Sequence, residues 1–141
     1  MRLVLDTSVI VSAFRSLNGG SRRVIDALDA GKYDILISQP LFLEYEDVLT
    51  RPEQMAVHGF PSQEIDAFLA NLADKAIRVT FHRRLRPHLR DPNDEHVLET
   101  AVNGLADAIV THNVYDFLPE TQKFGVAVLT PGDIIRTRLR L

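Results

Sequence analysis

The chain has 141 residues, of which 45% are hydrophobic and 25% are charged, proportions that are ordinary for a globular protein. Lys and Arg number 16 against 19 Asp and Glu, and the resulting formal net charge of −3 argues against a protein that coats nucleic acid by charge alone. Because the chain has no cysteine, disulfides, thiolate catalysis and cysteine-based metal sites are excluded.

The first element is a short apolar run, Leu3 to Leu5, that ends abruptly at Asp6. The run is too short and too polar for a signal peptide or a membrane span, so we expect a cytoplasmic protein with no membrane association. It suits a buried strand over residues 2–5, followed by a helix over residues 7–15. Ligands of open α/β sheets bind beyond the carboxyl ends of the strands, so Asp6 is a candidate functional residue. The alternative is that Asp6 only caps the helix.

Helix and strand patterns then alternate along the chain. The predicted elements are a helix over residues 21–31, a strand over 33–38, helices over 40–50 and 63–75, a strand over 76–81, a helix over 92–103, strands over 108–111 and 126–129, and a short closing helix or tail from residue 131. Strands that alternate with helices favour the α/β class, as a three-layer α/β/α sandwich with a mainly parallel sheet of about five strands. We expect one domain over residues 1–141.

The helix over residues 40–50 carries acids beside its apolar stripe. Glu44 and Glu46 flank the stripe on opposite sides, and Asp47 points away from it. Helical geometry does not choose between the two glutamates. An acid on such a flank is commonly a solvated residue or a salt-bridge partner.

The helix over residues 92–103 places an acid on its apolar stripe. Asp94 shares this stripe with Val97 and Leu98, so we expect its carboxylate to face inward. A buried carboxylate is costly unless it is paired or bound to metal, which favours a functional role. The alternative is a surface position, with Asp91 as the helix cap and Asp94 favouring the helix dipole.

The strand over residues 108–111 ends as the first one does, with polar residues after an apolar run. Asn113 and Asp116 follow it and are candidates for the same carboxyl edge, although such residues are also ordinary turn formers. His112 lies beside them, but no other histidine stands at metal-ligand spacing from it. We therefore interpret His112 as a neighbour of the site.

These positions form an all-oxygen set, which comprises Asp6, Glu44 or Glu46, Asp94, Asn113 and Asp116. Carboxylate oxygen, amide oxygen and water are the ligands that suit Mg²⁺ or Mn²⁺. Clustered carboxylates repel one another in the absence of a cation. A bound ion can activate water and neutralise the charge that develops on a phosphodiester, so the set points to metal-dependent phosphodiester hydrolysis.

Four segments resemble the successive motifs of a known family: LVLDTSVIVSAF, SQPLFLEYEDVLTRP, RDPNDEHVLETAV and ADAIVTHNVYDFL. In this order and spacing they resemble PIN-domain proteins, and most closely the toxin components akin to VapC, over nearly the whole chain. The resemblance implies a parallel-sheet α/β/α fold and Mg²⁺- or Mn²⁺-dependent cleavage of RNA. It also implies a cognate antitoxin that blocks the site, and a homodimer.

The resemblance extends to individual residues. The family's first three acids match Asp6, Glu44 and Asp94. The second match selects Glu44 over Glu46, a choice that helical geometry alone leaves open. Asn113 stands where the family usually has Asp, so a neutral oxygen replaces a charge. Asp116 matches a further acidic position that often follows.

Other functions remain to be weighed against this one. A phosphatase of the haloacid-dehalogenase type needs a second Asp two residues after Asp6, where this chain has Ser8. A nucleotide-binding Rossmann domain needs a glycine-rich loop after the first strand, which is absent. A PIN-like module that binds RNA or protein without cutting stays open, and Asn113 is its best support. The basic stretch over residues 82–90 could contact RNA phosphates or be a solvated loop.

Overall fold

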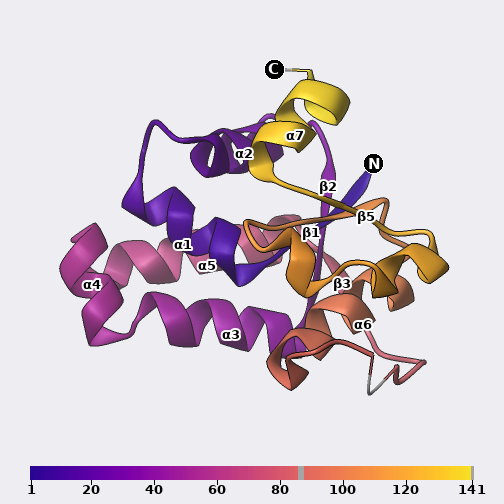
Figure 1. The fold of residues 1–141 in the computed structure, drawn as a ribbon. Helices are drawn as coiled ribbons and strands as arrows, with labels where there is room; N and C mark the ends of the chain where they lie inside the picture. Colours follow the sequence, from indigo (N-terminus) through magenta and orange to yellow (C-terminus); the bar gives the residue numbers. More distant parts are fainter. Residues whose placement is uncertain (86–87, 141) are drawn as a thin grey trace.

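The computed structural model describes residues 1–85 and 88–140, and its centre is a sheet of 5 parallel strands (Figure 1). The strands are β1 (Arg2–Leu5), β2 (Asp34–Ser38), β3 (Ile77–Val79), β4 (Ala108–Val110) and β5 (Ala127–Leu129), and their order is β3-β2-β1-β4-β5. The side chains of Leu3 to Leu5 and of β4 are completely buried, as expected for central strands covered on both faces. The predicted α/β fold with a parallel, five-stranded sheet is confirmed.

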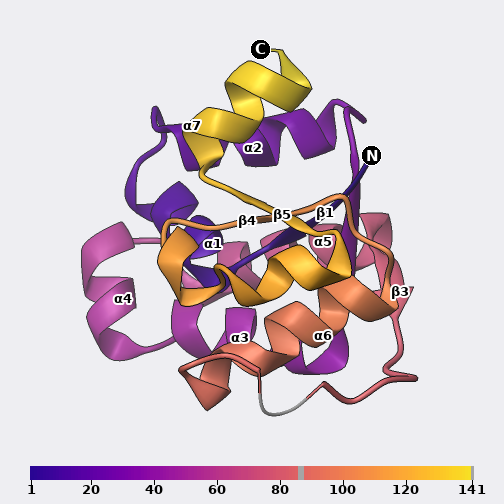
Figure 2. The ribbon, with the colours of Figure 1, turned by 45° about the vertical axis from the view of Figure 1, so that its right-hand side comes forward.

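Helices cover both faces of the sheet. They are α1 (Thr7–Arg15), α2 (Gly20–Asp29), α3 (Gln39–Leu49), α4 (Pro52–His58), α5 (Ser62–Lys75), α6 (Glu95–Asn103) and α7 (Pro131–Ile134). Shorter helical turns are η1 (Pro92–Asp94), η2 (Val114–Asp116), η3 (Glu120–Phe124) and η4 (Ile135–Leu139). Helix α6 contacts β1, β2 and β4, whereas α2 and α7 lie together on the opposite side (Figure 2). None of the described helices is long and apolar enough to cross a membrane.

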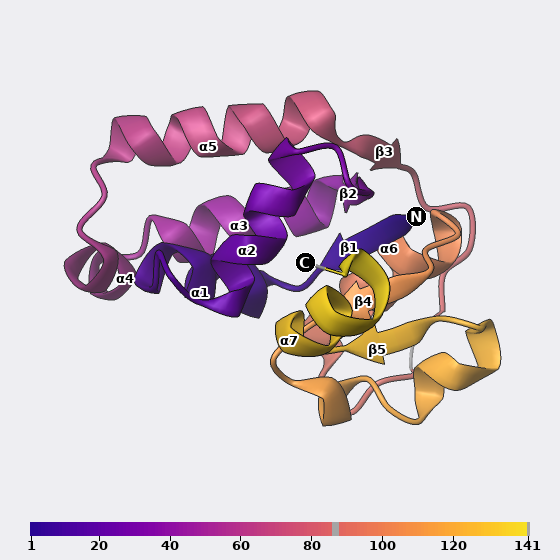
Figure 3. The same ribbon diagram turned by 90° about the horizontal axis from the view of Figure 1, so that it is seen from above.

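The chain changes direction across the sheet between β1 and β4. From β1 it continues to β2 and β3 on one side, and it later returns to β4 and β5 on the other. Helices α4 and α5 extend away from β4 and β5 (Figure 3). Leu5 pairs with Val110, so the next residues, Asp6 and Thr111, lie side by side at the carboxyl edge. This edge is the switch point at which open α/β sheets bind their ligands.

The last predicted helix before β4 divides into two elements, η1 and α6. The Asp91 carboxylate accepts a hydrogen bond from the amide of Asn93 at 2.9 Å, and the Asp91 carbonyl accepts one from the amide of Asp94 at 3.0 Å. These bonds tighten the first turn, so the α-helix begins only at Glu95. Asp94 is therefore half-buried at the helix end, not central on the buried face as predicted. Glu95 and Glu99 are buried on that helix instead.

Helix α4 was not predicted, because Arg51-Pro52 reads as the end of the preceding helix. In the structure, Pro52 is the first residue of a new helix, a position that proline favours. The helix has no buried residue, so its sequence carries no apolar stripe that would reveal it.

The basic stretch before α6 is held by side chains of that helix. Glu95 accepts hydrogen bonds from the amides of His88 and Leu89, at 2.7 and 2.8 Å. Asn103 accepts from the amide of Arg83 at 2.9 Å. Arg86 of the same stretch lies outside the described residues. These bonds attach the stretch to the scaffold, a contact that its composition alone does not predict.

Gly104 lets α6 end close to the sheet, and we expect Gly104→Ala to destabilise the fold. An added Cβ would lie 2.8 Å from side-chain carbons of both Leu36 and Val79, so the replacement should cost about 1–3 kcal/mol of the free energy of unfolding. Gly20→Ala is the matched control, because its Cβ would meet nothing closer than 3.7 Å. Urea titrations of both variants test this, and equal midpoints would contradict it.

Candidate metal centre

Asp6 is buried at the tip of β1, with 7% of its surface exposed. Its Oδ2 atom accepts hydrogen bonds from the hydroxyls of Thr111, at 2.7 Å, and Ser8, at 2.8 Å. Burial raises the pKa of Asp6, and the nearby Glu44 charge adds to this rise, while the hydroxyls oppose it. Asp6 precedes α1, but its side chain makes no capping hydrogen bond. Asp6 thus occupies the N-cap position of α1, but hydroxyls, and not a capping hydrogen bond, hold its side chain at the switch point.

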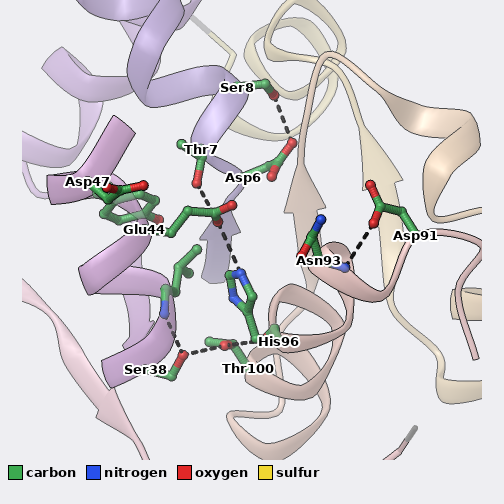
Figure 4. Close-up of polar contacts among 12 residues, drawn as sticks. Asp6, Thr7, Ser8, Ser38, Glu44, Asp47, Asp91, Asn93, His96 and Thr100 are labelled. Atoms are coloured by element: carbon green, nitrogen blue, oxygen red, sulfur yellow. Dashed lines mark hydrogen bonds and ion pairs between the residues drawn. The ribbon is translucent and has the colours of Figure 1, made fainter. Parts of the chain in front are cut away.

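Glu44 reaches the same region from α3. Its Oε2 atom accepts a hydrogen bond from the Thr7 hydroxyl at 2.7 Å and lies 3.1 Å from Nε2 of His96 (Figure 4). Burial alone would raise the pKa of Glu44, but the hydrogen bonds from His96 and Thr7, together with the charges of His96 and Arg51, lower this pKa below its usual value. Glu44 is therefore oriented as a carboxylate near Asp6, whereas Glu46 on the same helix is exposed.

Asp94, at the end of η1, lies within range of the charges of the other acids. Its pKa is raised to about 6, first by burial and then by the charges of Asp6, Asp91, Asp116 and Glu44. A shift of this kind requires the carboxylates to lie within electrostatic range of one another. Acids that follow β1 and that lie in α3 and η2 are thus close enough for their charges to act on Asp94, although they are far apart in the sequence.

The two candidates after β4 lie at the exposed rim of this region. The amide of Asn113 donates to the Thr111 hydroxyl at 2.9 Å, which links the loop to the same hydroxyl that holds Asp6. The amide of Asp116 donates to the carbonyl of Asn113 at 3.0 Å, within η2. Both side chains are exposed, in contrast to the buried carboxylate of Asp6.

His96 and the site's hydroxyls are contacts that sequence reasoning did not identify. His96 is two residues after Asp94, and its role becomes visible only when α6 packs against α3. Thr111 is 105 positions from Asp6, and Thr7 is 37 positions from Glu44. The polar residues that directly follow β1 and β4 were the available signal for the hydroxyls. No comparable pattern marked His96.

The donor atoms suit a hydrated divalent cation better than a fully caged one. Among the residues that the structure describes, no group of three or more acidic or histidine side chains is arranged to hold a metal ion by itself. Mg²⁺, however, usually keeps several waters and binds through one or two carboxylates. Burial and then repulsion by the other acids raise the pKa of Asp94, and a cation would relieve this repulsion. The residues present therefore fit an ion bound partly through water.

Comparison with known proteins identifies the family. A family model described as PIN domain matches residues 2–115. The chain belongs to the PIN-domain family. The match includes Asp6, Glu44, Asp94 and Asn113, while Asp116 lies just beyond it. The resemblance that the sequence motifs carry is thereby confirmed at the level of the family.

One structural neighbour of this PIN domain is a chain in the crystal structure of VapBC2 from Rickettsia felis, bound to a DNA fragment from their promoter. The two chains superpose with a TM-score of 0.60 at 16% sequence identity, over 92% of this chain and 98% of that one. This likeness supports the fold. A search among curated protein sequences finds no significant match.

Proposed function

We propose that this PIN-domain protein is a divalent-metal-dependent endoribonuclease that hydrolyses phosphodiester bonds of RNA with Mg²⁺ or Mn²⁺. The observation that carries the proposal is the position of Asp6 and Glu44, two carboxylates that hydroxyls and His96 hold at the switch point. Burial raises the pKa of Asp94, and the charges of these two acids add to the rise. Carboxylates this close repel one another without a cation. A bound cation would remove the repulsion and could neutralise the charge on a phosphate.

The proposed roles follow from the contacts of each residue. Asp6 and Glu44 are held by hydroxyls and by His96, so their oxygens are preorganised to receive an ion. Asp94, Asn113 and Asp116 would complete or tune the shell, directly or through water. When bound, the ion supplies an activated water and neutralises charge on the phosphate. The surrounding residues orient the carboxylates, and His96 and Thr7 favour the ionised form of Glu44.

The protein's partners and cellular context are part of the same proposal. The structural neighbour comes from a complex called VapBC2, which supports a role as the toxin of a toxin–antitoxin pair. By this analogy we propose a cognate antitoxin that covers the site, a homodimer, a cytoplasmic location and one domain over residues 1–141. A small open reading frame beside the gene, whose product copurifies with this chain, is the expected observation.

A matched pair of variants on α3 tests the role of Glu44. Glu44→Gln should lower the rate of Mg²⁺-dependent RNA cleavage on the order of 10²-fold, because it removes a charge placed near Asp6. Glu46→Gln changes an exposed acid of the same helix and should leave the rate unchanged. The assay uses labelled RNA with Mg²⁺, with Mn²⁺ and with EDTA. Equal loss in both variants, or cleavage that persists in EDTA, would contradict the proposal.

The second candidate function is an RNA- or protein-binding module that does not cut. The neutral Asn113 favours it, as does the lack of a complete cage of ligands among the described residues. Calorimetry separates the two candidates. Binding of Mg²⁺ or Mn²⁺ at millimolar concentrations is expected for the nuclease, and no binding is expected for the module.

A further inference from the structure

Tyr115 is the most exposed large hydrophobic side chain among the described residues, with 80% of its surface accessible. An aromatic ring usually buries most of its area, and a buried tyrosine usually finds a partner for its hydroxyl. Tyr45, for comparison, is completely buried and donates its hydroxyl to the Leu5 carbonyl. The ring of Tyr115 therefore contributes little to the core of this chain.

The turn that presents Tyr115 is firmly attached to the scaffold. Within η2, the amide of Phe117 donates to the carbonyl of Val114 at 3.1 Å, and the Phe117 side chain is completely buried. The amide of Asn113 is bound to the Thr111 hydroxyl at 2.9 Å. These contacts give the exposed ring a fixed base, in contrast to a side chain on a frayed end.

The turn also belongs to the rim of the carboxylate region. Tyr115 lies two residues after Asn113, whose amide donates to the Thr111 hydroxyl, and that hydroxyl in turn donates to the Asp6 carboxylate at 2.7 Å. On the other side, the guanidinium of Arg90 donates a hydrogen bond to the Tyr115 carbonyl at 2.6 Å. Arg90 is exposed and belongs to the basic stretch before η1. An exposed ring and an exposed cation therefore meet at one turn, and this turn is linked through Thr111 to Asp6.

We propose that Tyr115 is a stacking platform for an unpaired base and that, with Arg90, it selects single-stranded RNA for this site. Bases in a duplex are stacked on one another and offer no free face, whereas unpaired bases stack readily on aromatic side chains. Such stacking tolerates any base, because every base has a π-face. Arg90 would meet the adjoining phosphate, which places the backbone beside the carboxylates. The inference rests on the proposed function in taking RNA as the ligand.

The test measures binding apart from cleavage. Fluorescence anisotropy with a short, unstructured, labelled RNA is recorded in Mg²⁺, with all variants in an Asp6→Asn background so that the RNA is not cut. Tyr115→Ala should weaken binding about 5- to 100-fold, the range expected for the loss of one stacked base. Tyr115→Phe keeps the ring and should bind within about twofold of its parent on the same argument. Leu105→Ala removes another exposed apolar side chain, near the amino end of β4, and should have no effect.

Two altered ligands sharpen the result. An abasic RNA of the same length should bind weakly and equally to the parent and to Tyr115→Ala, because it has no base to stack. A duplex of the same sequence should likewise show no dependence on Tyr115. The proposal is overturned if Tyr115→Ala binds as the parent does, if Tyr115→Phe is as weak as Tyr115→Ala, or if the parent binds no RNA.

Failure of this inference is distinguishable from failure of the proposed nuclease. Metal-dependent cleavage that needs Glu44 but is indifferent to Tyr115 would leave the nuclease in place and remove the stacking platform. For the cleaving enzyme, the platform predicts that Tyr115→Ala raises KM and changes kcat little, since the ring binds substrate away from the reacting phosphate.

Discussion

Asp6→Asn is expected to lower the rate of RNA cleavage by about 100-fold or more without unfolding the protein. Asparagine keeps the size of the side chain, and its oxygen can still accept hydrogen bonds from Ser8 and Thr111. The negative charge at the carboxyl edge is lost, however, and with it the attraction for a cation that the proposal assigns to Asp6. Because burial raises the pKa of Asp6, the neutral asparagine should leave the melting temperature equal or higher.

The matched control for this variant lies at the opposite end of the sheet. Asp107 precedes β4 and accepts a hydrogen bond from the amide of Arg2 at 2.8 Å, so Asp107→Asn makes the same chemical change away from the site. Rates on labelled RNA and melting temperatures are measured side by side for both variants. If Asp6→Asn cuts as fast as the parent, the assignment of Asp6 to the metal centre is wrong.

The fold could be predicted because its strongest signals are local. The apolar runs before Asp6 and Thr111 are long enough to be buried strands, and the polar residues after them mark the carboxyl edge. Helix α4 was not predicted, because none of its residues is buried and its sequence therefore shows no periodic pattern of apolar residues. The short turn at Pro92 was not predicted, although the alternative interpretation, with Asp91 as the cap, is confirmed: the Asp91 carboxylate accepts a hydrogen bond from the Asn93 amide.

The acidic residues of the candidate site could be predicted from the sequence, but the residues that contact them could not. Asp6 and Asp94 stood out because each interrupts an apolar pattern, although Asp94 reaches the region from a helix end and not from a buried stripe. Glu44 could be chosen over Glu46 only through the resemblance to PIN domains. The contacts of His96 with Glu44 depend on how α3 and α6 pack. No spacing within either helix encodes that contact, since it joins residues far apart in the chain.

The last prediction concerns how a divalent cation should change the stability of the protein with pH. The pKa of Asp94 is about 6 in the folded protein, against an ordinary value of 3.8. Protonated Asp94 therefore favours the folded state, and this contribution is present below pH 4 and is lost as the pH rises through about 6. Asp6 shifts in the same direction. Without metal, these two acids should make the fold less stable at pH 7.5 than at pH 5.

A bound cation should reverse this loss, because it binds the carboxylate form. At ten times the dissociation constant, Mg²⁺ should add about 1.4 kcal/mol at pH 7.5, or a few degrees in melting temperature, and much less at pH 5. Asp94→Asn should reduce the pH dependence of the melting temperature without metal. It should also reduce the difference between the stabilisation by Mg²⁺ at pH 7.5 and at pH 5. Asp66→Asn, on an exposed position of α5, should leave both as in the parent.

Thermal melts at the two pH values, with Mg²⁺ and with EDTA, give all of these quantities. The prediction is contradicted if Mg²⁺ stabilises the protein equally at pH 5 and pH 7.5, or if Asp94→Asn leaves this stabilisation unchanged. Either result would show that binding of the cation does not depend on Asp94. The experiment does not require RNA or cleavage. It therefore tests whether the mutual repulsion of the acids is the property that recruits the ion, independently of what the ion then does.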